Sequence, residues 1–360
     1  MIRSAIIIII MIMCLAGCTM APAYKRPDAP VPSSWPSGPA YKQAGSDQAV
    51  TAAADMGWRE FYTDEKLQQV ISLALINNRD LRVATLNIEK ARALYRIQRA
   101  QILPTVNATG SLNEYKTPSS LSETGEAYNV RVYNANLGIS SWEVDFFGRV
   151  RSLKDRALEQ YLATEHARRS AQISLIAEVA NAYLTLAADI ENLELARSTL
   201  ATQESSYNMI NRRYELGSSS ELDLNQARTR VEAARVDVAR YTALTAIDGN
   251  ALNLLVGTPV PAELLSEKLD ATATPKDISV SLSSEVLLQR PDILQAESML
   301  KAANANIGAA RAAFFPTINL TTSIGTTSND LYNLFKAGAG AWSFVPQVIL
   351  PIFDSGSRWA

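Results

Sequence analysis

Residues able to do chemistry are few and scattered in this sequence. It has one histidine, His166, and two cysteines, Cys14 and Cys18. His166 stands among charged neighbours, which is typical of a solvated helix face. No His or Cys residues have zinc-site spacing, and no phosphate-binding glycine motif is present. The Asp and Glu residues lie among Arg and Lys on helical stretches, where i,i+4 pairing explains them. We therefore expect no catalytic site, no metal site and no bound cofactor.

Cys18 has a more specific context. Arg3 begins a short positive region, an apolar run follows from Ala5 to Leu15, and the run ends in Leu15-Ala16-Gly17-Cys18. This pattern resembles a bacterial lipobox, which predicts a signal peptide over residues 1–17 and a covalent lipid on Cys18. The apolar run is shorter than the ~20 residues that a membrane span needs. Since Asp does not follow Cys18, we expect sorting to the outer membrane.

Composition defines a tether and excludes one class of partner. Residues 18–60 contain proline with Ser, Gly and Ala, which favours an extended segment over a packed core. We expect these residues to be a lipid-anchored tether. The formal net charge of −2 indicates that the protein is not a general nucleic-acid binder.

A long helix dominates the rest of the chain. Arg149 to Leu216 contains no glycine or proline, and as one helix it would be about 100 Å long. Globular helices rarely exceed about 20 residues, so a coiled coil, a helical repeat or a tall hollow assembly is implied. Gly217 and the following serines predict a turn, and Glu221 to Val256 predicts a second arm. The sequence therefore predicts an antiparallel helical hairpin with unequal arms.

Two further helices precede strand-like segments. One runs from Asp64 to about Leu103, with a candidate break at Asn77-Asn78, and the other from about Ser284 to Phe315. After each helix the hydrophobic period changes to two, the pattern of a half-buried strand. Four strands of about 10 residues are predicted, which is the length of a membrane-spanning β-strand. A soluble hairpin would show the same alternation. The apolar positions of the first two strands are Val106, Ala108, Leu112, Tyr133, Ala135, Leu137 and Ile139.

The helix-to-strand pattern occurs twice at a fixed spacing. Asp80 aligns with Asp292 and Pro104 with Pro316, and 292 − 80 and 316 − 104 both give 212. Such self-similarity indicates a duplicated structural unit. We assign residues 61–260 to a first repeat of helix, two strands and helical hairpin. Residues 261–283 are a linker, and residues 284–360 are a second, incomplete repeat.

Several motifs together point to one family. They are the lipobox, Tyr24-Lys25-Arg26-Pro27, the Leu103-Pro104 and Phe315-Pro316 steps, Trp142 to Gly148, and Arg213 to Gly217. In order and in motif, the chain resembles a TolC-like outer membrane factor of the NodT type, an outer membrane efflux lipoprotein, and the resemblance covers the whole chain.

The resemblance implies an α+β fold in which a homotrimer, with four strands per protomer, makes one β-barrel in the outer membrane. Long helices would continue it as a periplasmic α-barrel. It implies a passive exit duct for drugs or other small molecules, joined by a periplasmic adaptor protein to an inner-membrane efflux pump. By the same resemblance, Arg213, Gly217 and Ser218 at the hairpin turn would contact the adaptor. Outer-membrane lipid would be a further partner, through Cys18.

One departure from the family stands out. The first repeat continues into a long helical hairpin, whereas the second stops soon after Phe353. Relative to the family we expect a C-terminal truncation, either a fragment or a truncated gene product, and the acidic ring that constricts the family's aperture cannot be assigned. Two alternative functions stay open, a type I secretion exit duct and a non-conducting periplasmic coiled-coil lipoprotein.

Overall fold

The computed structural model describes residues 19–27, 56–266, 284–356 and 358. The chain divides into two compact units. The strand unit comprises Met1–Asp28, Ile88–Thr164 and Gln295–Ala360, and the helical unit comprises Ala29–Asn87 and Glu165–Leu294. The predicted signal peptide, Cys18, most of the tether and residues 267–283 of the linker lie outside the described residues.

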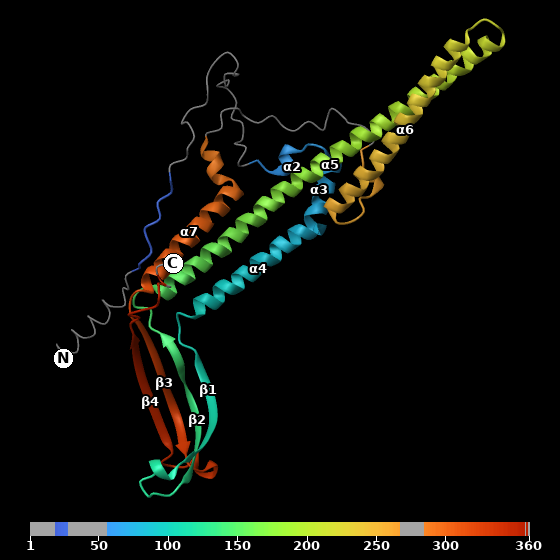
Figure 1. Ribbon diagram of the computed structural model, residues 1–360. Helices are drawn as coiled ribbons and strands as arrows, with labels where there is room; N and C mark the ends of the chain where they lie inside the picture. The colour runs from blue at the N-terminus through green and yellow to red at the C-terminus, as the bar shows by residue number, and fades with distance from the viewer. Residues whose placement is uncertain (1–18, 28–55, 267–283, 357, 359–360) are drawn as a thin grey trace. The chain divides into compact units, whose positions relative to one another are not determined.

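A four-stranded antiparallel sheet forms the strand unit's β-structure (Figure 1). The strands are β1 (Val106–Thr117), β2 (Tyr128–Glu143), β3 (Thr317–Ser328) and β4 (Gly340–Ile349), and they lie in the order β1-β2-β3-β4. Short 3₁₀ turns, η1 (Ser119–Leu121) and η5 (Leu331–Asn333), lie in the two hairpin loops. The four predicted strands are confirmed, and β2 at 16 residues is longer than expected.

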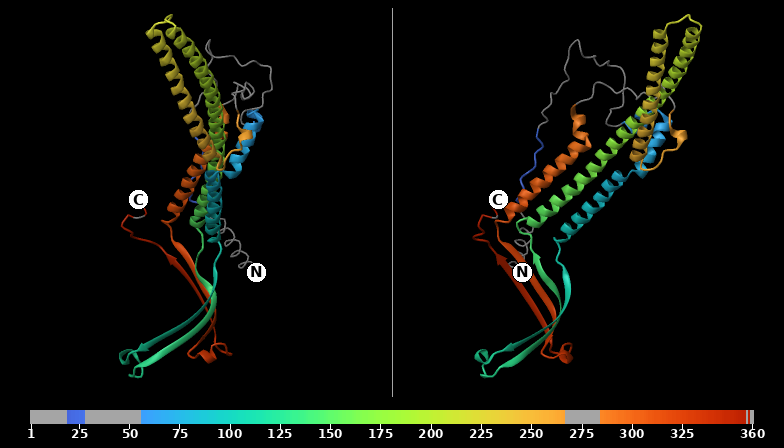
Figure 2. Two further views of the ribbon diagram at one scale, coloured as in Figure 1. Left: turned by 90° about the vertical axis from the view of Figure 1, so that its right-hand side faces the viewer. Right: turned by 45° about the vertical axis from the view of Figure 1, so that its right-hand side comes forward.

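The sheet is curved, and features of its central strands β2 and β3 explain the curvature. Figure 2 shows the four strands bending in the same sense. A register shift between Ile139 and Trp142 inserts one extra residue into β2, which increases local twist and bending. A Cβ on Gly138 would collide with Thr322 O and one on Gly325 with Ala135 O. Glycine at these two positions therefore allows β2 and β3 to approach closely.

Three helices continue from the sheet, namely α4 (Arg79–Ala100), α5 (Arg149–Glu215) and α7 (Pro291–Ala312). Adding 212 to both ends of α4 gives the two ends of α7, 79 + 212 = 291 and 100 + 212 = 312. Adding 212 to Tyr128 likewise gives Gly340, the first residue of β4. The predicted internal repeat is therefore confirmed in the boundaries of its elements.

The helix predicted from about Ser284 to Phe315 is wrong at its start. Residues 284–289 form a separate 3₁₀ turn, η4 (Ser284–Gln289), and the α-helix begins only at Pro291. Proline lacks the N–H that a helix interior requires but fits its first position, so Pro291 starts the helix.

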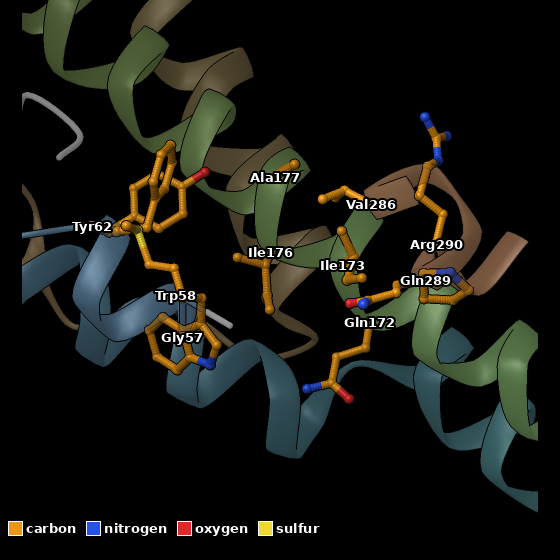
Figure 3. Close-up of a pocket in the computed structure, with 13 residues that line it drawn as sticks. Gly57, Trp58, Tyr62, Gln172, Ile173, Ile176, Ala177, Val286, Gln289 and Arg290 are labelled. Carbon is orange, nitrogen blue, oxygen red and sulfur yellow. The ribbon is translucent and has the colours of Figure 1, made fainter. Parts of the chain in front are cut away.

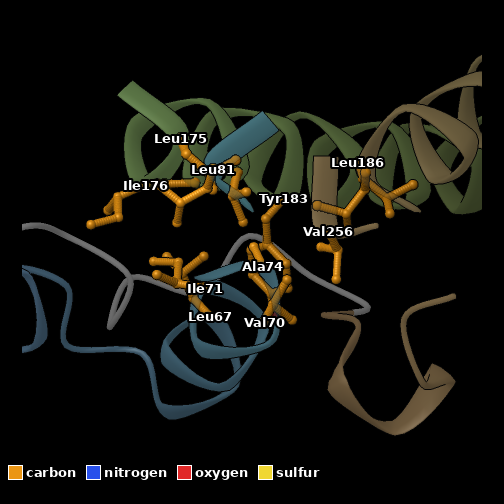
Figure 4. Packing of buried hydrophobic residues seen from close by; sticks show 13 residues of the cluster. Leu67, Val70, Ile71, Ala74, Leu81, Leu175, Ile176, Tyr183, Leu186 and Val256 are labelled. Atoms are coloured by element: carbon orange, nitrogen blue, oxygen red, sulfur yellow. The ribbon is translucent and has the colours of Figure 1, made fainter. Parts of the chain in front are cut away.

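The helical unit surrounds one hydrophobic core (Figure 4). Its elements are α2 (Trp58–Phe61), α3 (Glu65–Asn77), α6 (Glu221–Val256), η2 (Ala262–Leu264) and most of α5. α3 has its apolar residues at helical spacing and packs them against α5 and α6. The fully buried members include Leu67, Val70, Ile71, Val179, Tyr183, Leu252 and Val256.

The candidate break at Asn77-Asn78 is confirmed, and tertiary contacts explain it. Asn78 ends α3 and begins α4, since its Oδ1 accepts from the backbone N–H of Leu81 at 2.8 Å. Its Nδ2 donates to Leu255 O at 2.8 Å, which links the break to the end of α6. Gly257, in the left-handed region at φ 80°, lies so close that a Cβ would be 2.5 Å from Asn77 O.

The predicted helical hairpin is confirmed as α5, a short turn and α6, with arms of 67 and 36 residues (Figure 2). Within the described residues, α5 is also the one helix long and apolar enough to cross a membrane by length and composition. Buried core helices of soluble proteins pass the same test. Because several core residues lie on α5, its apolar character reflects packing in the helical unit.

Candidate functional site: a two-faced sheet and a hairpin tip

The register of the strands decides which side chains share a face of the sheet. Val106 pairs with Ile139 and Leu137 pairs with Ile324, so alternate residues of neighbouring strands share a face. On that face Trp342 is 79% exposed, Ile324 69% and Leu137 56%. Large exposed apolar side chains gathered on one face of a sheet are unfavourable in water and mark a membrane or protein interface. The aligned apolar members are Val106, Ala108, Leu112, Tyr133, Ala135, Leu137, Ile139, Ile318, Leu320, Ile324, Trp342, Phe344 and Val348.

The opposite face carries mainly Asn, Ser and Thr, with Val345 and Ile349 of β4 among them, and several of its polar side chains bond across the strands. Ser323 and Ser343 are joined at 2.8 Å between their hydroxyl oxygens. Thr327 Oγ1 donates to Asn134 Oδ1 at 2.8 Å, and Asn134 Nδ2 donates to Ser111 Oγ at 3.4 Å. One face thus suits hydrocarbon and the other suits water, which is the pattern of a channel wall.

Aromatic residues lie at both ends of the sheet. At the helix end, Phe147 and Phe315 stack with ring centroids 4.9 Å apart, and Trp142 Nε1 donates to Ile102 O at 3.2 Å. At the loop end, the Lys336 ammonium lies 3.6 Å from the centroid of the Tyr332 ring. Aromatic girdles at two levels are typical of the interfaces of a membrane-spanning barrel.

The junction between β2 and α5 is fixed by carboxylates. Asp145 caps the helix, its two oxygens accepting from the backbone N–H groups of Val150 and Arg151 at 2.9 Å each. Arg151 also forms an ion pair with Asp145 at 3.0 Å, and Arg149 forms a bidentate pair with Glu143. The sequence motif Trp142 to Gly148 is therefore a stiff connection between strand and helix.

The predicted contact residues meet in one turn at the hairpin tip. Gly217 adopts φ 74°, which a residue without Cβ adopts at little cost. Gly217 N–H bonds to Tyr214 O at 2.9 Å and Ser218 N–H to Arg213 O at 2.8 Å, the two bonds of a Schellman cap. Ser218 Oγ also donates to Arg213 O at 3.0 Å. The structure thus brings Arg213, Gly217 and Ser218 together on an exposed turn.

The second arm begins with a capping box. Ser220 Oγ accepts from the N–H of Asp223 at 3.1 Å, and Asp223 Oδ2 accepts from the N–H of Ser220 at 3.1 Å. The Ser220 hydroxyl and backbone N–H hold the pKa of the Asp223 carboxyl below its usual range. The backbone groups at both helix ends of the turn therefore have local hydrogen-bond partners. Leu216 and Leu222, beside the turn, are exposed.

The helical unit holds an open apolar cavity of about 640 Å³ (Figure 3). Trp58 and Tyr62 line one side, and Ile173 and Ile176 of α5 lie between them and Val286 of η4. Arg290 at the rim forms an ion pair with Asp292 at 2.7 Å. The lining is mostly apolar, and Gln172, Gln289 and Arg290 are its polar side chains.

Titratable groups form no metal site among the described residues, where no three His, Cys, Asp or Glu side chains cluster. His166, predicted to be solvated, is instead half-buried.

The sequence did not reveal a carboxyl pair between the hairpin arms, Asp189 and Asp248. Burial and the hydrogen bond to Asp189 raise the pKa of Asp248. The partners are 59 residues apart (248 − 189), so no local pattern signals the pair.

A curved sheet with one lipid-compatible face, continued by long helices, defines the class of outer-membrane channel proteins. The model of one family, outer membrane efflux protein, matches residues 70–258 and 282–360. The toluene efflux pump outer membrane protein TtgC of Pseudomonas putida is 52% identical over 344 residues, 95% of this chain and 70% of that protein. OprJ of Pseudomonas aeruginosa, an outer membrane protein, is 43% identical over 96% of this chain and 71% of its own length.

Solved structures give the same result. The open-state MtrE outer membrane channel of Neisseria gonorrhoeae superimposes with a TM-score of 0.82 at 38% identity, covering 95% of this chain and 74% of that channel. The chain belongs to the outer membrane efflux protein family and has the α+β fold of the TolC-like channels. It is an outer-membrane efflux component that extends into the periplasm, and its relatives are channel proteins rather than enzymes.

Proposed function

We propose that three copies of the chain close a twelve-stranded barrel and form a passive exit duct. The carrying observation is the two-faced sheet, whose outer strands β1 and β4 each pair with one neighbour among the described strands. Unpaired strand edges cannot face lipid, because their N–H and C=O groups would lack partners. Three four-stranded sheets joined edge to edge satisfy every edge.

The driving force would come from other proteins. Among the described residues, no group of three or more His, Cys, Asp or Glu side chains could hold a metal ion, and conduction needs only a polar wall. An inner-membrane pump would load the duct through a periplasmic adaptor. The names of relatives mention toluene and antibiotics, which supports small, largely apolar molecules or drugs as cargo.

The hairpin tip is the proposed adaptor contact. Its support is the exposed turn that Gly217 and Ser218 shape around Arg213 O. Changing Arg213 to Glu should abolish co-purification with the adaptor and leave the cap unchanged, since the cap uses only the backbone of this residue. Arg230→Glu on α6 is the matched control. Equal adaptor recovery with both variants would contradict the contact.

The lipid anchor at Cys18 is a separate proposal. Its support is the lipobox sequence together with Thr19 at the following position. Cys18→Ser should abolish labelling by radioactive palmitate. Label that persists in this variant would rule out acylation at Cys18.

The duct itself is tested in planar bilayers. The protein purified from outer membrane should have the mass of a trimer and give single-channel currents. Thr321→Lys, on the polar face and exposed, should shift ion selectivity toward anions. A trimer without conductance would favour the non-conducting lipoprotein.

A further inference from the structure

Charged side chains are rare in the four strands. β1 and β2 carry four of them, namely Glu114, Lys116, Arg131 and Glu143, and β3 and β4 carry none. Glu114 pairs with Arg131 and follows Leu112 by two positions, so this pair belongs to the apolar face. Lys116, two residues further along β1, shares that face. Three of the four charges therefore lie on the face that carries the apolar side chains.

The bulge in β2 turns Glu143 to the polar face. Before the bulge, odd-numbered residues of β2 such as Ile139 lie on the apolar face. The extra residue reverses this order, so that Trp142 pairs with Leu320 of the apolar face and Glu143 pairs with Asn319 of the polar face. Bulges redirect side chains in this way. Glu143 is therefore the one charged residue that the four described strands place on the polar face.

Arg149, the first residue of α5, neutralises Glu143. Its Nε donates to Glu143 Oε1 at 2.8 Å, and its Nη2 donates to the other carboxylate oxygen. The neighbouring Asp145 and Arg151 form a second ion pair at 3.0 Å. Two carboxylates and two guanidinium groups thus balance at this junction. Loss of any one of them would leave a net charge.

The pair borders an open cavity that is lined largely by polar side chains. Glu143 and Arg149 share with them a space of about 440 Å³. The Arg149 side chain is 36% exposed and that of Glu143 is 19% exposed. A charge left alone at this place would therefore act on ions in the adjoining water. The other polar members of the lining are Gln101, Thr105, Asn107, Ser140 and Ser141.

The pair lies at the end of the sheet from which the helices continue. Glu143 is the last residue of β2, and Arg149 is the first residue of α5. Since the protein extends from the outer membrane into the periplasm, this is the periplasmic end of the polar face. In the proposed three-copy duct, on which this inference rests, three such pairs would surround the entrance from the helices into the barrel.

We propose that the Glu143–Arg149 pair determines the ion selectivity of the duct at this entrance. A fixed charge influences dissolved ions over about 8 Å at physiological ionic strength, and three like charges around one opening act together. Because each Glu143 cancels one Arg149, the wild-type entrance carries no net charge from these residues. The intact pair therefore keeps the wall formed by the sheet neutral toward both anions and cations.

The test is the reversal potential of the purified full-length protein in planar bilayers under a KCl gradient at low salt. Glu143→Gln leaves Arg149 uncompensated and should lower the ratio of K⁺ to Cl⁻ permeability by about threefold. Arg149→Gln leaves Glu143 uncompensated and should raise this ratio by a similar factor. The double variant E143Q/R149Q removes both charges and should return to the wild-type ratio.

The matched control is the ion pair on the apolar face. Arg131 Nε and Glu114 Oε1 are 2.9 Å apart, and their side chains are 58% and 40% exposed. Glu114→Gln also leaves an arginine uncompensated, but on the face directed away from the duct. The ratio of K⁺ to Cl⁻ permeability in this variant should equal that of the wild type. The mass of the trimer, measured for every variant, shows that assembly is retained.

Three results would overturn the proposal. The first is a conducting wild type whose permeability ratio is unchanged in both E143Q and R149Q. The second is a shift in Glu114→Gln as large as that in E143Q. The third is a shift in the same direction for E143Q and R149Q, which is expected if the pair serves only to stiffen the connection between β2 and α5. A wild-type trimer that carries no current would instead contradict the duct itself, and the inference with it.

Discussion

The sheet and the helical core use apolar side chains in opposite ways. In the sheet, Trp342 is 79% exposed and Ile324 69%, whereas Tyr183 in the core is 2% exposed and Ile71 is fully buried. A water-soluble protein removes apolar area from water by packing it inside, at about 25 cal/mol per Å². The sheet keeps its apolar surface on the outside, where lipid instead of protein covers it. The two regions therefore fold against different solvents, and substitutions should separate them.

The largest effect is expected in the helical core. Ile71→Ala removes a fully buried side chain of α3 and leaves a cavity, which should lower the free energy of unfolding by about 2–5 kcal/mol. Ile76→Ala, on the same helix at 79% exposure, should change it by less than about 0.5 kcal/mol. Denaturant titration of the full chain in detergent measures both. Similar values for the two variants would refute the core described for α3.

The lipid face should respond to charge, and the polar face should not. Ile324→Arg places a guanidinium toward hydrocarbon and should destabilise the inserted sheet by about 2–4 kcal/mol. Thr321→Arg, on the polar face of the same strand, should insert normally. The measurement is the fraction of protein that resists protease in outer membranes. If Thr321→Arg proves the more damaging change, the assignment of the two faces is reversed.

Alkaline pH should weaken the core through Tyr183. Burial and the charge of Asp64 raise the pKa of Tyr183 to about 12, and its hydroxyl bonds to Leu264 O at 3.2 Å. Since the unfolded pKa is about 10, the stabilisation is complete below pH 10 and is lost between pH 10 and 12. The loss should reach about 2 kcal/mol by pH 12. Tyr183→Phe should lack this component of the pH dependence, and identical curves for both proteins would exclude it.

A change of similar or smaller size is expected where β2 and β3 approach closely. Gly325→Ala would press a methyl group on Ala135 O and Asn136, and should cost about 1–3 kcal/mol. At Gly110 the nearest atom to an added Cβ is 4.0 Å away, so Gly110→Ala should be close to neutral. Heat-induced dissociation on gels compares the two. Equal behaviour would mean that the curvature does not depend on this contact.

Much of the fold was predictable because its signals are local. The alternation of apolar and polar residues can be seen within each strand alone. The helix boundaries at Arg149, Glu221 and Val256 follow from neighbouring glycine, proline and capping residues. The 212-residue repeat could be found from sequence because both copies keep their residue order. The tip was predictable for the same reason, since Gly217 and Ser218 act within one turn.

Other features needed the tertiary structure. Arg26 and Glu297 are 271 residues apart, and no local pattern pairs them. The same holds for Asn78, whose role at the helix break depends on Leu255. The 3₁₀ turn Ser284–Gln289, which precedes Pro291, was predicted as α-helix because propensity alone does not distinguish the two.

By itself, the sequence determined the elements, their two repeats and the alternation that gives each strand an apolar and a polar side. The tertiary structure decided the register that aligns those sides across four strands, the bulge at Ile139/Trp142, and the contacts that residues 21–26 make with α7. The physical reason is the separation along the chain over which each interaction acts. Alternation and capping act between residues a few positions apart, whereas register and packing depend on contacts that form only when distant segments meet.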